Sequence, residues 1–133
     1  MNTATPLPAV GQPLAGGIYA GITTGTDGTP YALVLLADKP AKALTWSAAC
    51  KWAAGLKADL PTRPESALLF ALLKAQFEEA WHWTSEEHAF DSSYAWSQYF
   101  LNGNQDSSHQ RYAGRARAVR KLPLQSFNPS VAS

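Results

Sequence analysis

The chain has 133 residues, of which 11 are Lys or Arg and 10 are Asp or Glu, so its formal net charge is +1. That length suits one domain and leaves little room for a second hydrophobic core. The near-zero net charge argues against non-specific electrostatic binding to nucleic acid or to an anionic membrane. Five Trp, five Tyr and five Phe supply ample surface to bury, which excludes disorder of the whole chain.

Cys50 is the single cysteine, which excludes an intramolecular disulfide and hence a disulfide-stapled secreted scaffold. We therefore expect the chain to fold in a reducing compartment. The longest apolar run, Tyr31 to Ala37, is too short to span a bilayer, so no membrane insertion is expected. The first ten residues carry no Lys or Arg and are interrupted by proline, so they do not resemble a signal peptide.

The N-terminal part of the sequence predicts an extended arm followed by a β-hairpin. Residues 1–16 are rich in proline, which blocks helix and central strand and favours extended backbone. Residues 17–22 and 31–37 have strand character, and the second run is apolar enough to be buried on both faces. Asp27-Gly28 between them is a strong hairpin-turn dipeptide.

Two helices are expected next. Thr45 is a suitable N-cap for a first helix that ends at Gly55. Thr62 and Glu65 have the spacing of a capping box, in which each side chain bonds the backbone N–H of the other residue, so they predict the start of a second helix. Both helices have an apolar stripe, which indicates core packing, and Cys50 lies on the first stripe as an inert packed thiol.

The second half of the sequence predicts short strands separated by long polar loops. The expected strands are residues 81–85, 94–101 and 115–122, and the expected polar segments are residues 86–93 and 102–110. Long loops in so small a domain are usually functional or mobile. The whole order predicts an α+β fold, with an arm at 1–16, a domain at 17–122 and an extended tail at 123–133.

Five short motifs follow one another along the chain. They are Trp46-x5-Trp52, Leu60-Pro61-Thr62-Arg63-Pro64-Glu65, Trp83-Thr84-Ser85, Trp96-x3-Phe100-x2-Gly103 and Arg117-Ala118-Val119-Arg120. As an ordered set they resemble the DUF1566 (Lcl C-terminal-like) domains of bacterial surface proteins and bacteriophages. The resemblance covers residues 17–122. It implies a C-type-lectin-like fold, in which two helices flank a small twisted antiparallel sheet with long loops.

The resemblance also implies which residues are structural. The implied core residues are Trp46, Trp52, Trp83, Trp96, Phe100 and Val119. The strand that contains Val119 would lie centrally in the sheet, and Arg117 or Arg120 would pair with a carboxylate such as that of Glu65.

A fold of this kind displays loops on a stable sheet, so we expect the ligand face in the loops at 85–93 and 102–113. The candidate ligand-binding residues are His88, Asp91, Tyr94, Asn104, Asp106, His109, Arg111 and Tyr112. Aromatic, imidazole and guanidinium groups can anchor an interface or stack on a sugar ring. The alternative is that Tyr94 and Tyr112 only brace the loops against the core.

The sequence lacks the residues that several kinds of functional site require. The Glu-Pro-Asn, Gln-Pro-Asp and Trp-Asn-Asp tripeptides of calcium-dependent lectins do not occur, and we expect no metal and no cofactor. His82 alternates with two Trp, so it should point to the face of that strand opposite the Trp side chains. Formylglycine-generating enzymes share the lectin-like fold but need a pair of reactive cysteines, whereas this chain has one.

Catalysis and nucleic-acid binding are also disfavoured. No nucleophile elbow occurs, and Ser, His and Asp in polar loops are common by chance, so we expect no enzyme. The arginines at 111–120 would divide between the two faces of a strand and cover aromatic rings or pair with acids, so no nucleic-acid partner is expected.

The preferred hypothesis is a non-enzymatic binding or structural module, encoded by a phage and acting in the virion as a tail-fibre, receptor-recognition or decoration protein. It would fold in the bacterial cytoplasm and bind a host cell-surface glycan or protein, or other virion proteins. The proline-rich ends favour a homo-oligomer, a trimer above all. One alternative is an intracellular phage protein that inhibits a host defence or regulatory protein, and another is a hydrolase that uses the loop His, Asp and Glu residues.

Overall fold

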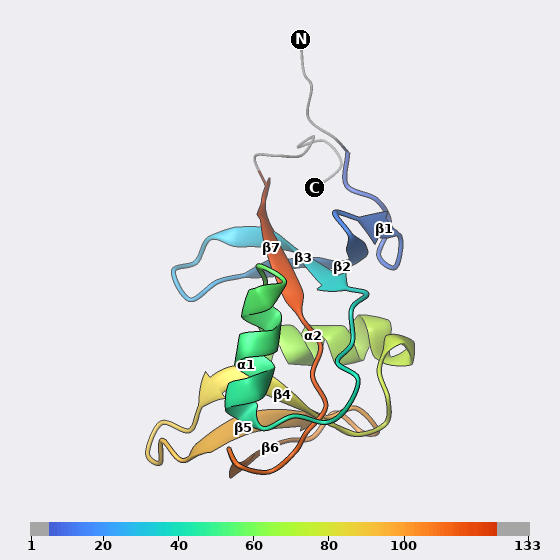
Figure 1. Ribbon diagram of the computed structural model, residues 1–133. Coiled ribbons are helices and arrows are strands. Elements are labelled where there is room, and N and C mark those ends of the chain that lie inside the picture. The colour runs from blue at the N-terminus through green and yellow to red at the C-terminus, as the bar shows by residue number, and fades with distance from the viewer. Residues whose placement is uncertain (1–5, 125–133) are drawn as a thin grey trace.

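Two small antiparallel sheets and two helices form the structure (Figure 1). The computed structural model of the chain describes residues 6–124. The elements are β1 Pro13–Leu14, β2 Gly17–Thr24, β3 Pro30–Leu36, α1 Trp46–Gly55, α2 Arg63–Leu73, the short 3-10 helix η1 Lys74–Gln76, β4 Trp81–Glu87, β5 Tyr94–Tyr99, β6 Gln105–His109 and β7 Val119–Pro123. One sheet has the order β1-β2-β3-β7 and the other β4-β5-β6. The predicted α+β class is confirmed.

The two helices fill the space between the sheets (Figure 1). Helix α1 packs on Val34 of the first sheet and on Trp83 of the second. Helix α2 contacts β2 on one side and β4 and β5 on the other. Strand β3 lies at the centre of the core, because Leu33 and Leu35 join the cluster around α2 while Val34 joins the cluster around α1. The prediction that this strand is buried on both faces is confirmed.

Local signals in the sequence placed the first hairpin and both helix starts correctly. The turn between β2 and β3 has Gly28 at φ +83°, and the backbone N–H of Thr29 donates to Asp27 Oδ1 at 2.9 Å. Helix α1 begins after Thr45, and α2 begins after Thr62 with both bonds of the capping box present. These features depend on neighbours within a few residues, which explains why they could be predicted.

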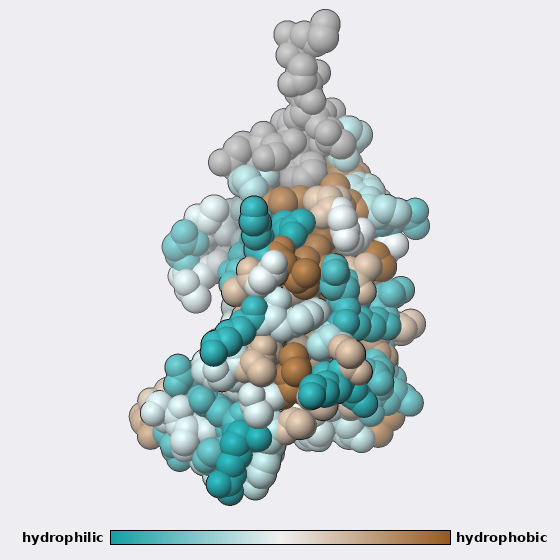
Figure 2. Space-filling model, viewed as in Figure 1, coloured by the Kyte–Doolittle hydropathy of each residue, from teal (hydrophilic) through white to brown (hydrophobic). Residues whose placement is uncertain are grey.

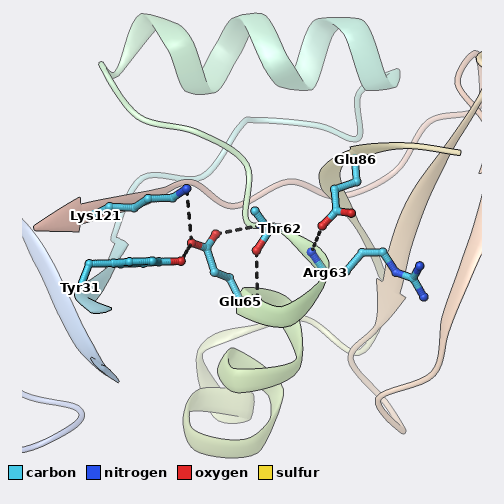
Figure 3. Close-up of polar contacts among 6 residues, drawn as sticks. All are labelled: Tyr31, Thr62, Arg63, Glu65, Glu86 and Lys121. Atoms are coloured by element: carbon cyan, nitrogen blue, oxygen red, sulfur yellow. Dashed lines mark hydrogen bonds and ion pairs between the residues drawn. The ribbon is translucent and has the colours of Figure 1, made fainter. Parts of the chain in front are cut away.

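The Glu65 side chain connects α2 to the first sheet (Figure 3). Its carboxylate is 1% exposed and accepts hydrogen bonds from the Thr62 backbone N–H at 2.8 Å and from the Tyr31 hydroxyl of β3. Lys121 Nζ of β7 lies 3.7 Å from the same carboxylate. One buried acid therefore holds the first turn of α2 against two strands.

The predicted pairing of Glu65 with Arg117 or Arg120 is wrong. Successive residues of a strand point to opposite faces, so Lys121 faces α2 with Val119, and Arg120 points the other way. Arg120 donates to the backbone oxygen of Leu56 at 3.0 Å, and Arg117 donates to that of Leu36 at 2.9 Å.

The segment predicted as a central strand at 115–122 instead links the two sheets. Strand β7 begins at Val119 and is the last strand in the order of the first sheet, so it is not central. Val119 itself also forms an isolated bridge with Asp59. Arg115 lies earlier in the segment and forms a parallel bridge with His82 of β4. Because the chain crosses between the sheets here, a single regular strand cannot span the whole segment.

Part of the polar segment predicted as a loop is also a strand. Residues 105–109 form β6, which pairs with β5 from Gln98↔Gln105 to Tyr94↔His109. The strand was not predicted because its sequence does not alternate apolar and polar residues. It is an edge strand whose side chains are mostly half-buried, so no apolar face is needed. The long loop expected around 102–113 is therefore reduced to two short turns flanking β6.

The predicted core residues divide into three groups. Trp83, Phe100 and Val119 are at most 2% exposed and belong to the core. Trp46 and Trp52 are half-buried and pack against the α1 cluster from its margin. Trp96 is not a core residue, because it lies on the side of β5 beside the N-terminus of α2, where the Arg63 guanidinium covers its ring at 3.6 Å.

The predicted N-terminal arm packs on the domain over the residues that the structure describes. Leu7 is 6% exposed and packs with Tyr19 and Ala32, and β1 pairs with β2. The expected boundary at residue 17 therefore excludes residues that belong to the domain. Residues 1–5 of the arm and 125–133 of the tail lie outside the described part, in which none of the helices is long and apolar enough to cross a membrane.

Glu65→Ala should lower the free energy of unfolding by about 3 kcal/mol, because it removes a capping bond and leaves the Tyr31 hydroxyl and Lys121 without their shared acceptor. The matched control is Glu86→Ala, since Glu86 also accepts from an α2 amide, that of Arg63 at 2.7 Å, but is only half-buried (Figure 3). We expect about 1 kcal/mol there. Urea unfolding followed by Trp fluorescence measures both, and equal losses would contradict the central role of Glu65.

Candidate ligand-binding face

The predicted ligand residues gather mainly at one end of the second sheet, where the β4–β5 turn meets the end of β6. Tyr94 lies directly across from His109, and their ring centroids are 5.4 Å apart. His88, Asp91 and Tyr94 line one shallow hollow. Hydrogen bonds from the Ser93 hydroxyl and backbone, together with the nearby imidazoles, lower the pKa of Asp91. Figure 2 shows mostly polar side chains over the β4–β5 turn.

Arg111 and Tyr112 continue this cluster along the chain. The Tyr112 ring lies 6.1 Å from that of His109, and the Arg111 guanidinium lies 5.9 Å from the Tyr112 ring. Tyr112 is 58% exposed, so it is available to a ligand. The expectation that Tyr112 only braces a loop against the core does not fit this exposure.

Asn104 and Asp106 do not join the others. Asn104 lies in the turn at the opposite end of the β5–β6 hairpin, where its N–H bonds the side chain of Asn102 at 3.0 Å. Asp106 is paired with Ser97, three positions along the ladder from the Tyr94–His109 pair; since side chains alternate between faces, an odd number of positions places Asp106 on the other face of the sheet.

Trp96 forms a stack on the same face as Tyr94. The Arg63 guanidinium lies 3.6 Å from the Trp96 ring, and the His88 ring stacks at 5.5 Å with an interplanar angle of 15°. Arg63 is held in place because its Nε donates to Gln105 Oε1 at 3.0 Å. The stack joins residues that are far apart in sequence, so sequence reasoning missed it. It also leaves the Trp96 ring largely covered by protein.

The opposite face of the sheet carries an aromatic groove with a volume of about 210 Å³. Its lining residues are Trp81, Trp83, Ser97, Ser108, Tyr112, Ala113 and Gly114. Trp81 is 38% exposed and stacks on Tyr99 with ring centroids 5.0 Å apart. The predicted placement of both Trp of β4 on one face is confirmed, but of the groove residues only Tyr112 was a predicted ligand residue.

The inner wall of the groove is rigid. Trp83 is buried, and its indole N–H donates to the backbone oxygen of Leu44 at 2.9 Å. A Cβ at Gly114 would lie 2.9 Å from that indole, so a glycine is required for the backbone to pass beside it. The groove therefore combines a fixed indole, a solvent-exposed indole and an exposed phenol with two serine hydroxyls.

His82 points to the face of β4 opposite Trp81 and Trp83, as predicted. It is 4% exposed and packs its ring against Phe77 and Phe100 at 5.2 and 5.0 Å, with Nδ1 2.9 Å from the backbone oxygen of Ala80. Burial, and secondarily the charge of Arg117, lowers the pKa of His82 to about 4. Within residues 6–124 no three His, Cys, Asp or Glu side chains are grouped so as to hold a metal ion.

Two further groups bear on catalysis. Burial raises the pKa of the Cys50 thiol, which disfavours a reactive thiolate. Burial and the hydrogen bond to Glu65 raise the pKa of the Tyr31 hydroxyl, which fits a structural donor. Ser108 and His109 are adjacent on β6 and point to opposite faces, so they do not form a nucleophile–base pair.

No family model matches the chain, and no curated protein matches it.

Acid should destabilise the protein through His82. Its pKa of about 4 lies below the ordinary value of 6.5, so between these two pH values the unfolded state takes up a proton that the folded state does not. The stability present above pH 6.5 is therefore lost progressively as the pH falls toward 4, by about 3 kcal/mol.

The measurement is the free energy of unfolding between pH 7 and pH 4, compared between the wild type and His82→Gln. The wild type should lose more stability over this range than the variant, whereas the control His109→Gln should follow the wild type. Identical pH dependence in the wild type and His82→Gln would show that His82 does not carry the effect.

Proposed function

We propose that the protein is a non-enzymatic binding module of the C-type-lectin-like, DUF1566 kind, which holds a cell-surface glycan in the groove between Trp81 and Tyr112. The observation that carries this proposal is the groove itself, in which exposed aromatic rings flank two serine hydroxyls. A pyranose ring has an apolar face of C–H groups and a rim of hydroxyls. Aromatic walls match the face, and serine hydroxyls can exchange hydrogen bonds with the rim.

The arrangement of the groove favours a sugar over a large apolar ligand. Its volume of about 210 Å³ is small, and it is open to solvent along Trp81 and Tyr112. Ser97 and Ser108 come from neighbouring strands and lie on one face of the sheet. The half-buried Ser108 hydroxyl can donate and accept, whereas Ser97 is 3% exposed and donates to the Asp106 backbone oxygen at 3.4 Å, so it offers a ligand only an acceptor. A rigid, shallow site with few polar groups suits a terminal sugar of a longer chain.

The fold supports the C-type-lectin-like part of the proposal. Two helices pack with antiparallel sheets, and β1 and β7 are the two edge strands of the same sheet, so the first and last described strands lie at the same end of the molecule (Figure 1). Leu7 and Leu124 belong to one apolar cluster there. The sheet β4-β5-β6, which carries the groove, lies at the other end of the molecule (Figure 1).

The biological setting that we propose is a phage virion, where the module acts in receptor recognition, as a tail-fibre or decoration component. A homo-oligomer, a trimer above all, belongs to this proposal because several weak sugar sites on one particle bind a cell surface with high avidity. Size-exclusion chromatography with light scattering tests this part, and a strict monomer at high concentration would contradict it.

The groove is tested with Trp81→Ala and Tyr112→Ala. Each removes an exposed ring, so the fold should persist while binding to host cells and to a glycan array weakens by roughly tenfold, equivalent to about 1.4 kcal/mol. Phe90→Ala is the matched control, since Phe90 is 94% exposed but lies in the β4–β5 turn, outside the groove.

Circular dichroism confirms that each variant is folded. Glycan binding that is lost equally in Phe90→Ala, or a wild type that binds no glycan and no host cell, would overturn the proposed site.

A further inference from the structure

A cavity much smaller than the aromatic groove lies where the chain crosses between the two sheets. Its volume is about 20 Å³, which is room for one water molecule or one monatomic ion. The side chains that line it are Lys39, Glu78, His82, Arg115 and Arg117, together with Pro40 and Ala116. It does not overlap the aromatic groove, since the two have no lining residue in common.

Arg117 is a buried cation in this cavity without a carboxylate partner. It is 4% exposed, and its terminal nitrogens donate to the backbone oxygens of Gln76 and Leu36. Neither of the two ion pairs found among residues 6–124 includes Arg117. A guanidinium that is withdrawn from water and bonded only to neutral carbonyls retains an uncompensated charge, which is costly.

The Nε–H of Arg117 also lacks a hydrogen-bond partner. Among the described residues this nitrogen is a buried side-chain polar atom with no acceptor. Buried donors in folded proteins nearly always have one. The guanidinium carbon lies 5.1 Å from the centre of the Phe77 ring, which is a cation–π contact. This contact does not give Nε–H a hydrogen-bond acceptor in the plane of the guanidinium.

The charge around the cavity is positive. Lys39, Arg115 and Arg117 face it against a single acid, Glu78, whose carboxylate lies 3.5 Å from Arg115 Nε. His82 lies on the same cavity and keeps its Nδ1 at the Ala80 backbone oxygen. After Glu78 offsets one cation, an excess of positive charge remains, and an anion is the complementary occupant.

We propose that the cavity binds one monatomic anion, chloride in ordinary buffers, which accepts the hydrogen bond of Arg117 Nε–H and compensates the guanidinium charge. Residues on four separate segments line the cavity: Lys39 after β3, Glu78 after η1, His82 on β4 and Arg117 before β7. The anion thus stabilises the junction of the two sheets. A water molecule could satisfy Nε but not the charge, and it is the alternative that the test excludes.

Anion binding should be coupled to protonation of His82. The groups that face this imidazole are Arg117, Arg115, Glu78 and Lys39. A bound anion offsets the cations among them and favours the protonated ring. Chloride should therefore bind more tightly at pH 5 than at pH 7, and the acid-induced loss of stability should be smaller in chloride than in a salt whose anion is too large to enter.

The direct test is a crystal of the full chain grown in sodium bromide, with anomalous diffraction recorded at the bromine edge. We expect an anomalous peak within hydrogen-bonding distance of Arg117 Nε. A parallel measurement compares the melting temperature in sodium chloride and in sodium gluconate at equal ionic strength, where chloride should give a saturable increase. Density without anomalous signal, together with equal melting temperatures in the two salts, would identify a water molecule and overturn the proposal.

The variant Arg115→Gln tests whether chloride binds in this cavity, and it leaves the buried Arg117 in place. Arg115 is partly exposed, so the variant should fold, and the loss of one facing charge should weaken chloride binding about fivefold. Arg111→Gln is the control, because it removes an exposed arginine that does not line the cavity and should leave the chloride affinity unchanged. An equal loss in both variants would mean general screening by salt and would also overturn the proposal.

Discussion

The arrangement of the molecule depends on the carboxylate of Glu65. It is buried, closes the first turn of α2 through the Thr62 amide, and is held to the first sheet by Tyr31 and Lys121. A buried charge is tolerated only where several donors share it, so these partners fix both the position and the direction of the helix. Because α2 lies between the sheets, its placement determines where the second sheet can pack.

The second sheet is attached to α2 by polar contacts of the same kind. Gln98, which is fully buried, donates to the backbone oxygen of Ser66 at 2.6 Å, and Gln105 donates to that of Arg63 at 2.8 Å. Arg63 then covers Trp96. One face of β4-β5-β6 is thus taken up by the helix start. The other face keeps Trp81 and Tyr112 exposed, which is why we place ligand binding there.

Local patterns predicted much of the fold and only part of the site. The caps at Thr45 and Thr62 and the Asp27-Gly28 turn involve residues a few positions apart, so their chemistry could be recognised in the sequence. Strand β6 was missed because an edge strand need not alternate apolar and polar residues. Trp96 was placed in the core because the family resemblance implied a core position, whereas here it is half-buried and a guanidinium covers it.

By itself, the sequence determined the α+β class, the first hairpin, both helix starts and the side of β4 on which its two Trp lie. Only the tertiary structure decided which strands form which sheet, which cation meets Glu65 and where the aromatic groove opens. The groove joins β4, β5 and β6 with residues 112–114, and the small cavity joins residues from Lys39 to Arg117. Side chains so distant along the chain are brought together by the packing of α2 and by the crossing of the chain between the sheets, which no local pattern encodes.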